Sequence, residues 1–152
     1  MNESSFRTVL ALGVMALATV EIGCGMCTEI GCTTAITAVV SIAGGVAPLE
    51  GAAARVCRGD QCVTTGFEVN LDQASCKGAG NEDFFVGCSV FADGAIFFTV
   101  DLVDPDAPDE EAYSFSVNAK DGSGLGAVSG VVVYEKSEIN GDGCGYCYEG
   151  SL

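Results

Sequence analysis

The chain has 152 residues, enough for one domain with a core of ordinary size, and it contains nine cysteines but no histidine. Without histidine it cannot build a Ser-His-Asp triad, a Cys-His pair or a histidine-ligated metal site. The formal net charge is −15, from 21 acidic and 6 basic residues. Such a surface repels phosphate backbones, which argues against nucleic acid as a partner.

The first 23 residues have the pattern of an export signal. Residues 1–8 form a weak n-region with one arginine and one glutamate, and Val9–Val20 are all apolar or small apart from Thr19. This apolar run is too short to span a bilayer as a helix, which takes about 20 residues, but it suits the h-region of a signal peptide. We therefore expect residues 1–23 to be a signal helix that carries the chain across a membrane.

Two processing sites compete at the end of this signal. Ile22-Gly23-Cys24 fits the end of a lipobox, although Glu21 stands where leucine is usual, and it predicts a lipid anchor on Cys24. The alternative is Ala16-Leu17-Ala18, a small-x-small cleavage site that would give a secreted protein. We favour the anchor, and with it the bacterial cell envelope. Gly25, rather than aspartate, after the cysteine favours the outer membrane.

The number of cysteines agrees with the lipid anchor, because nine is odd and one thiol must be left over. If Cys24 is acylated, eight remain for disulfides: Cys27, Cys32, Cys57, Cys62, Cys76, Cys88, Cys144 and Cys147. Their spacing suggests local bridges from Cys57 to Cys62 and from Cys76 to Cys88. The other four would tie the two ends together across roughly 100 residues, worth about 4–5 kcal/mol in the chain-entropy model.

From Thr33 onward the sequence predicts an all-β domain with turn signals every 8–12 residues. Apolar and polar residues alternate best in the expected strands, which are Thr33–Ile42, Ala52–Cys57, Cys62–Leu71, Phe84–Phe91, Ala95–Val103, Tyr113–Ala119 and Val128–Tyr134. In Cys62–Leu71, this alternation predicts that Phe67, Val69 and Leu71 point inward.

The connections between these strands carry turn chemistry. Arg58-Gly59-Asp60-Gln61 reads as a hairpin loop, Asp93-Gly94 as a two-residue turn, and residues 72–83 as a polar loop. About seven strands without a convincing helix predict an antiparallel β-sandwich, Ig-like or Greek-key, with a small Greek-key barrel as the alternative. We expect residues 24–32 to be a cysteine-containing linker and residues 33–152 to form a single domain.

Two motifs at the ends of this domain carry a resemblance. Cys27-Thr-Glu-Ile-Gly-Cys32, and Tyr134-Glu-Lys-Ser-Glu-Ile-Asn-Gly-Asp-Gly-Cys144, resemble the terminal motifs of small cysteine-rich predicted lipoproteins of myxobacteria. Those proteins open with C-T-x-I-G-C after the lipidation site and close with N-G-x-G-C and a second cysteine. Here two residues separate Cys144 from Cys147, where the family pattern has three. The family has no established activity, so the resemblance implies location and architecture only.

Three chemical alternatives remain open. Cys144-x-x-Cys147 has the spacing of a dithiol oxidoreductase, and Cys24-x-x-Cys27 repeats it, so the four thiols also suit a zinc site. The segment after Cys147 is too short for the helix that lowers a catalytic thiol pKa, which favours structural disulfides. Asp104, Asp106 and Asp109 lie in an acidic loop and are weak candidates for Ca²⁺ ligands.

The tripeptide Arg58-Gly59-Asp60 is the one that integrins recognise, but Gly-Asp is also what a hairpin turn requires. Taken together, the sequence predicts a non-enzymatic, lipid-anchored envelope protein with a binding or structural role and an unknown protein or glycan partner. A secreted domain that recognises its ligand through Ca²⁺ is the alternative, and a dithiol oxidoreductase is the third. Apart from that Ca²⁺, no cofactor is expected.

Overall fold

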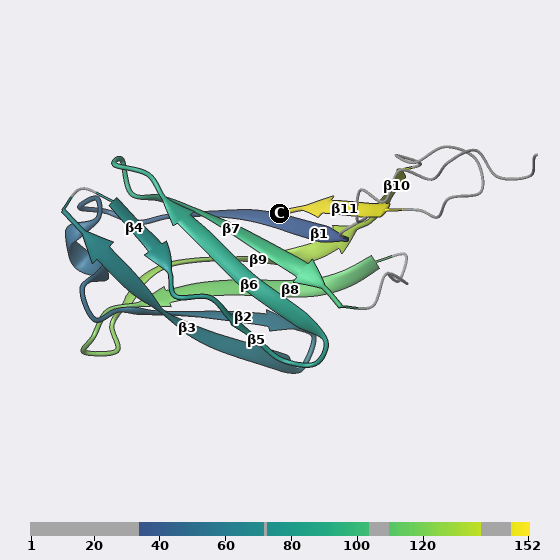
Figure 1. Ribbon diagram of the computed structural model, residues 1–152, viewed down its shortest axis with the longest axis horizontal. Coiled ribbons are helices and arrows are strands. Elements are labelled where there is room, and N and C mark those ends of the chain that lie inside the picture. Colours follow the sequence, from purple (N-terminus) through teal and green to yellow (C-terminus); the bar gives the residue numbers. More distant parts are fainter. Residues whose placement is uncertain (1–33, 72, 104–109, 138–146) are drawn as a thin grey trace, which may run out of the picture.

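The computed structural model describes residues 34–71, 73–103, 110–137 and 147–152. Within these ranges, regular structure consists of eleven strands and one turn of 3-10 helix, Ala47–Leu49 (Figure 1). No helix in them is long and apolar enough to cross a membrane. The strands are β1 Ala35–Ser41, β2 Ala53–Arg58, β3 Gln61–Asn70, β4 Gln73–Cys76, β5 Ala79–Gly80, β6 Phe84–Val90, β7 Ala95–Leu102, β8 Glu110–Asn118, β9 Gly124–Val133, β10 Glu135–Ser137 and β11 Cys147–Ser151.

The strands form one open sheet in the order β10-β11-β1-β7-β6-β4-β3-β2-β8-β9, with β5 paired to β6. This sheet folds over on itself, so that β6 and β7 cross β2 and β8 at an angle as two layers (Figure 1). The all-β, sandwich-like architecture expected from the sequence is confirmed. β3 belongs to both layers, because Gln61–Gly66 pair with β2 and Phe67–Asn70 pair with β4.

The core lies between the two layers and is filled by alternate side chains of each strand. Phe98 on β7 and Phe115 on β8 are fully buried and meet across the layers, with ring centroids 5.4 Å apart. The alternation predicted for β1 is confirmed, since Ile36, Ala38 and Val40 are all buried. Burial of aromatic and branched side chains of this size supplies most of the driving force for folding.

The strand pairing differs from the expectation in three places. Residues 72–83, predicted as a loop, contain β4 and β5; β4 is short and polar, and its backbone pairs with both β3 and β6. β11 lies between β10 and β1 and pairs with β1 in parallel, so the sheet is mixed rather than purely antiparallel. Leu71 does not point inward: it is 97% exposed, with a φ of 53°, where the chain turns out of β3.

Two Asp-Gly turns have the same geometry, and each loop spans three residues rather than the two expected for Asp93-Gly94. In the first, Gly94 N–H donates to Phe91 O at 2.9 Å and Phe91 N–H donates to Ala95 O at 2.8 Å. Gly122 N–H donates to Ala119 O at 2.9 Å in the second turn. Gly94 and Gly122 have φ values of 87° and 86°, a left-handed conformation that disfavours any side chain.

These turns differ in their surroundings, which gives a matched test of the packing between the layers. A Cβ on Gly94 would collide with the carbonyl of Ile42, whose own N–H donates to Gly94 O at 3.0 Å, whereas nothing lies within 4 Å of a Cβ on Gly122. We predict that Gly122→Ala costs about 1 kcal/mol, from the backbone alone. Gly94→Ala should cost at least about 1 kcal/mol more, because the end of β1 must move.

Urea unfolding of the two variants beside the wild-type protein measures both costs. Equal losses of stability would show that the turn at Gly94 does not pack against the end of β1 as described.

Candidate functional site

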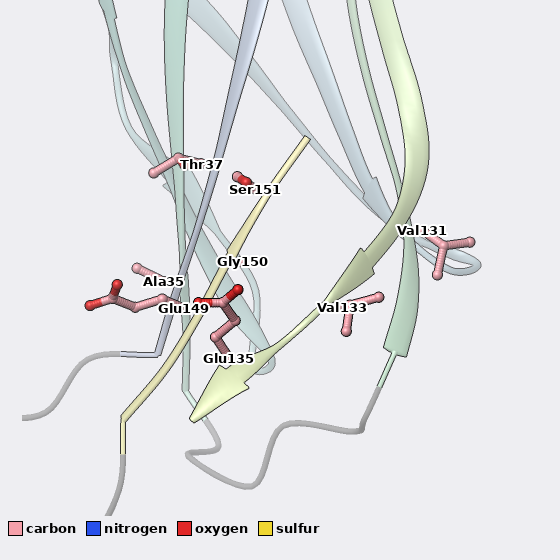
Figure 2. Close-up of a pocket in the computed structure, with 8 residues that line it drawn as sticks. All are labelled: Ala35, Thr37, Val131, Val133, Glu135, Glu149, Gly150 and Ser151. Atoms are coloured by element: carbon pink, nitrogen blue, oxygen red, sulfur yellow. The ribbon is translucent and has the colours of Figure 1, made fainter. Parts of the chain in front are cut away.

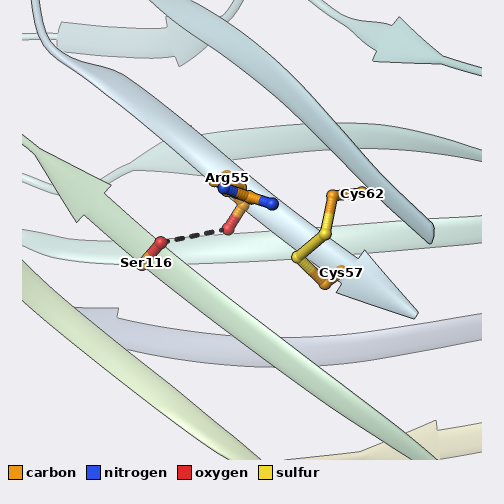
Figure 3. Close-up of a disulfide and its surroundings, with 4 residues drawn as sticks. All are labelled: Arg55, Cys57, Cys62 and Ser116. Atoms are coloured by element: carbon orange, nitrogen blue, oxygen red, sulfur yellow. Dashed lines mark hydrogen bonds between the residues drawn. A yellow bond between two sulfur atoms is a disulfide. The ribbon is translucent and has the colours of Figure 1, made fainter. Parts of the chain in front are cut away.

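Every cysteine in the described part of the chain is disulfide-bonded. Cys57 and Cys62 join directly opposed positions of β2 and β3 (Figure 3), and Cys76 joins β4 to Cys88 on β6. Both local bridges suggested by the spacing are therefore present. Cys147 is also disulfide-bonded and is 3% exposed. The remaining predicted positions lie outside the described residues: Cys24, Cys27, Cys32 and Cys144.

Cys147 is the first residue of β11 rather than the start of a helix. A buried cysteine in a disulfide at the start of a strand lacks the helix dipole that activates the thiols of dithiol oxidoreductases. The structure thus offers the third alternative no support at this position. For calcium, Asp104, Asp106 and Asp109 lie outside the described residues, and β8 begins just after them at Glu110. Among the described residues, no group of three or more acidic or cysteine side chains is arranged to hold a metal ion.

A groove of about 590 Å³ lies between β9 and the β1–β11 pair (Figure 2). We call it the edge groove. β11 runs through the middle of the view in Figure 2, with the side chains of β1 on one side and those of β9 on the other. The residues that line the edge groove are Ala35, Thr37, Val131, Val133, Glu135, Glu149, Gly150 and Ser151.

Strand register brings these distant segments together. Ala35 lies opposite Glu149 and Thr37 opposite Ser151 in the parallel pair, while Glu135 lies opposite Glu149 in the β10–β11 pair. Directly paired positions place their side chains on the same face of a sheet, so the two carboxylates and the two hydroxyls share one face. Gly150 is required here, because a Cβ at this position would collide with Val132 Cγ1 on β9.

The edge groove combines negative charge with apolar walls. Two glutamates at directly opposed positions repel each other by an amount on the order of 0.2–1 kcal/mol, which a bound cation would relieve. Val131 and Val133 are 57% and 65% exposed, unusual for valines in the middle and at the end of a strand. A ligand that offers positive charge beside a short apolar group would complement both features.

A second polar site joins the ends of three strands. Arg58 Nε donates to Glu111 Oε2 at 2.6 Å, and Tyr113 and Tyr134 donate to the same oxygen at 3.3 and 3.2 Å. The two tyrosine hydroxyl oxygens are 2.8 Å apart. Burial raises the pKa of Tyr113 and Tyr134, so both hydroxyls stay protonated. Burial alone would lower the pKa of Arg58, but the hydrogen bond to Glu111, together with the charge interactions with Glu111 and the two tyrosines, outweighs it and the pKa is raised.

The polar cluster of Arg58, Glu111, Tyr113 and Tyr134 indicates the role of the Arg58-Gly59-Asp60 tripeptide. The side chain of Arg58 is only 15% exposed and is held by Glu111, 53 residues away in the chain. Gly59 N–H donates to Ala112 O at 2.9 Å and fixes the turn against β8. Because a ligand for integrins must present its arginine freely, we interpret the tripeptide as a structural turn.

Comparisons with known proteins add no relative. The chain matches no protein-family model, and no curated protein or solved structure is similar enough to count as a match.

We predict that Glu111→Gln destabilises the fold by about 1.5–3 kcal/mol, because Arg58 loses the charged partner of its hydrogen bond while remaining mostly buried. The neighbouring exposed Glu110 is the matched control, and Glu110→Gln should stay within about 0.5 kcal/mol of wild type. Urea unfolding at neutral pH measures both. Similar stabilities of the two variants would show that the polar cluster contributes nothing.

Proposed function

We propose that this protein is a non-enzymatic binding domain of the bacterial cell envelope, anchored by lipid on Cys24, with the outer membrane favoured over the inner one. The disulfides support export, because such bonds persist in oxidising compartments and are rare in the cytosol. Both complete bridges lie within the sandwich, and a further cysteine, Cys147, is bonded at its edge. The resemblance at Cys27–Cys32 and Tyr134–Cys144 supports the same location.

The edge groove carries the binding part of the proposal. Its volume falls in the range of natural ligand sites, about 300–1,000 Å³. Glu135 and Glu149 meet there at directly paired positions, next to the exposed Val131 and Val133. We propose that the ligand is a segment of a partner protein with Lys or Arg side chains beside apolar ones. The net charge of −15 would steer such a segment toward the domain.

The anchor is tested by replacing the acylated residue. Cys24→Ser should move the full-length protein from the membrane fraction to the soluble fraction or leave its signal uncleaved, because a serine cannot carry the thioether-linked lipid. Fractionation followed by intact-mass measurement of the wild-type protein reads this out: acyl chains add their mass to a chain that begins at residue 24. A wild-type mature protein that begins at Thr19 without added mass would contradict the anchor and favour secretion.

The groove is tested with a labelled peptide of alternating lysine and leucine. Glu135→Gln/Glu149→Gln should weaken its binding at least about tenfold, as expected when two charge-assisted contacts of roughly 1 kcal/mol each are lost. The control variant Glu50→Gln/Glu68→Gln removes the same charge from exposed positions outside the groove and should weaken binding by less than about threefold.

Fluorescence anisotropy at 150 mM salt measures both affinities. Equal weakening by the two double variants would mean that the peptide follows overall charge only, and the groove would then not be the binding site. Absence of wild-type binding would reject this class of ligand. Neither result bears on the lipid anchor.

A further inference from the structure

We propose that the Cys57–Cys62 disulfide is a reactive site that exchanges with a dithiol reductant, while the rest of the fold stays oxidised. The inference rests on the placement of this bridge and not on the edge groove. Cys62 is exposed and Cys57 is half-buried. Exposed disulfides are the ones that exchange readily, whereas buried ones are structural.

The strand that carries Cys62 leaves it open to approach. The first half of β3, Gln61–Gly66, pairs with β2 on one side, and β4 pairs only with Phe67–Asn70. In the described part of the chain, β2 is therefore the only strand that pairs with β3 at Cys62. A thiol from a partner protein can reach its sulfur from the open side without displacing a strand.

The second bridge provides the contrast within the same molecule. Cys76 and Cys88 are both half-buried and pack against the hydrophobic core, and their bond ties β4 to β6. By contrast, Cys62 is exposed, and Cys57 is not among the partly buried hydrophobic side chains that pack against this core. Their bond also spans only five positions of a hairpin that is already held by the β2–β3 ladder, in which Ala53–Arg58 pair with Gln61–Gly66. Opening it leaves that ladder and the β2–β8 pairing in place.

The surface around this bridge is chemically unlike the rest of this acidic chain. On the same face, cross-strand pairing aligns Cys57 with Ser114 and Ser129, and Arg55 with Thr64, Ser116 and Ala127. We call this surface the hydroxyl face; none of the residues that define it is acidic. The nearest carboxylate in the sequence is Asp60, in the turn itself.

Arg55 is the charged group of the hydroxyl face. It is exposed and lies two residues before Cys57 on the same side of β2, diagonal to Cys62 (Figure 3). Diagonal neighbours on a sheet are within reach of a long side chain. A guanidinium within reach of the bridge would stabilise a thiolate and so favour the sulfur that leaves during exchange. The backbone of Arg55 is fixed from β8, where Ser116 Oγ donates to its carbonyl at 3.5 Å.

Exchange with the dithiol proceeds in two steps. A thiolate of the partner attacks Cys62 Sγ, a bond forms between these two sulfurs, and the Cys57–Cys62 bond breaks with its electron pair on Cys57. Cys57 leaves as a thiolate beside Arg55 and later takes a proton from water. The partner's second thiol then attacks the mixed disulfide and releases Cys62. Two electrons pass from the dithiol to the hairpin, and the partner becomes a disulfide.

Graded reduction of the folded protein with dithiothreitol tests the proposal. Samples are alkylated at intervals, and peptide mass spectrometry gives the reduced fraction of each bridge. We expect Cys57–Cys62 to open at least about tenfold faster than Cys76–Cys88, with the far-UV circular dichroism unchanged. Equal rates for the two bridges, or opening of Cys57–Cys62 only together with loss of the β signal, would overturn the proposal, because the bridge would then be an ordinary structural one.

Arg55 has its own test in the same assay. Arg55→Gln should slow the opening of Cys57–Cys62 by about threefold, Arg55→Lys should keep most of the rate, and neither should change Cys76–Cys88. Lys120→Gln, at an exposed position in another turn, is the charge-matched control and should leave both rates unchanged. If Lys120→Gln slows the reaction as much as Arg55→Gln, overall charge accounts for the effect and the role of Arg55 is rejected.

Discussion

The fold depends on one strand that serves both layers. β3 pairs with β2 through its first half and with β4 through its second half, and the change of partner falls at Gly66. Gly66 O accepts a hydrogen bond from Lys77 N–H at 3.0 Å, so the backbone remains satisfied where the strand leaves one layer for the other. Glycine suits such a corner because it carries no side chain into the bend. Each complete disulfide then secures one side of this corner, Cys57–Cys62 toward β2 and Cys76–Cys88 toward β6.

On the opposite side of the molecule, small residues on β9 allow the two layers to approach each other closely. β9 carries glycine at several positions, and a Cβ on Gly126 would approach Ser41 O to 2.8 Å and Val40 Cγ1 to 2.9 Å on β1. A Cβ on Gly130 would come within 2.6 Å of Leu152. The edge strand of one layer can therefore lie directly on the edge strands of the other. Larger side chains would separate the edges, and the edge groove would lose the wall that β9 supplies.

The sequence predicts the strands that are fixed by their own buried side chains, and it misses those that are fixed only by pairing with distant strands. β1, β2, β6, β7 and β8 agree with their expected ranges to within a few residues, because alternating burial of large side chains fixes them. β9 was expected from Val128 but starts at Gly124, since its glycines satisfy packing without adding hydrophobicity. β4, β10 and β11 are short and polar, and their pairing with distant strands leaves no local signal.

The sequence also could not predict the candidate sites, because they are formed by strands that are distant in the chain. The edge groove draws its lining from β1, β9, β10 and β11, and the polar cluster joins residues as far apart as Arg58 and Glu111. Alternation indicates which side chains point inward but not which strands become neighbours. The local disulfides were predictable because their partners are five and twelve positions apart, on consecutive parts of the chain.

The two surfaces to which we assign roles lie at the same end of the sandwich. Val131 lines the edge groove and also borders a smaller cavity with Gly59, which belongs to the turn just beyond Cys57. Ala35, another residue of the groove, follows Cys24 by about eleven residues, a span of at most roughly 40 Å when fully extended. With lipid on Cys24, the groove and the exchange site would both stay close to the membrane surface. A partner for either would then be expected to reside in the same envelope layer, because this short tether keeps both sites from reaching far beyond it.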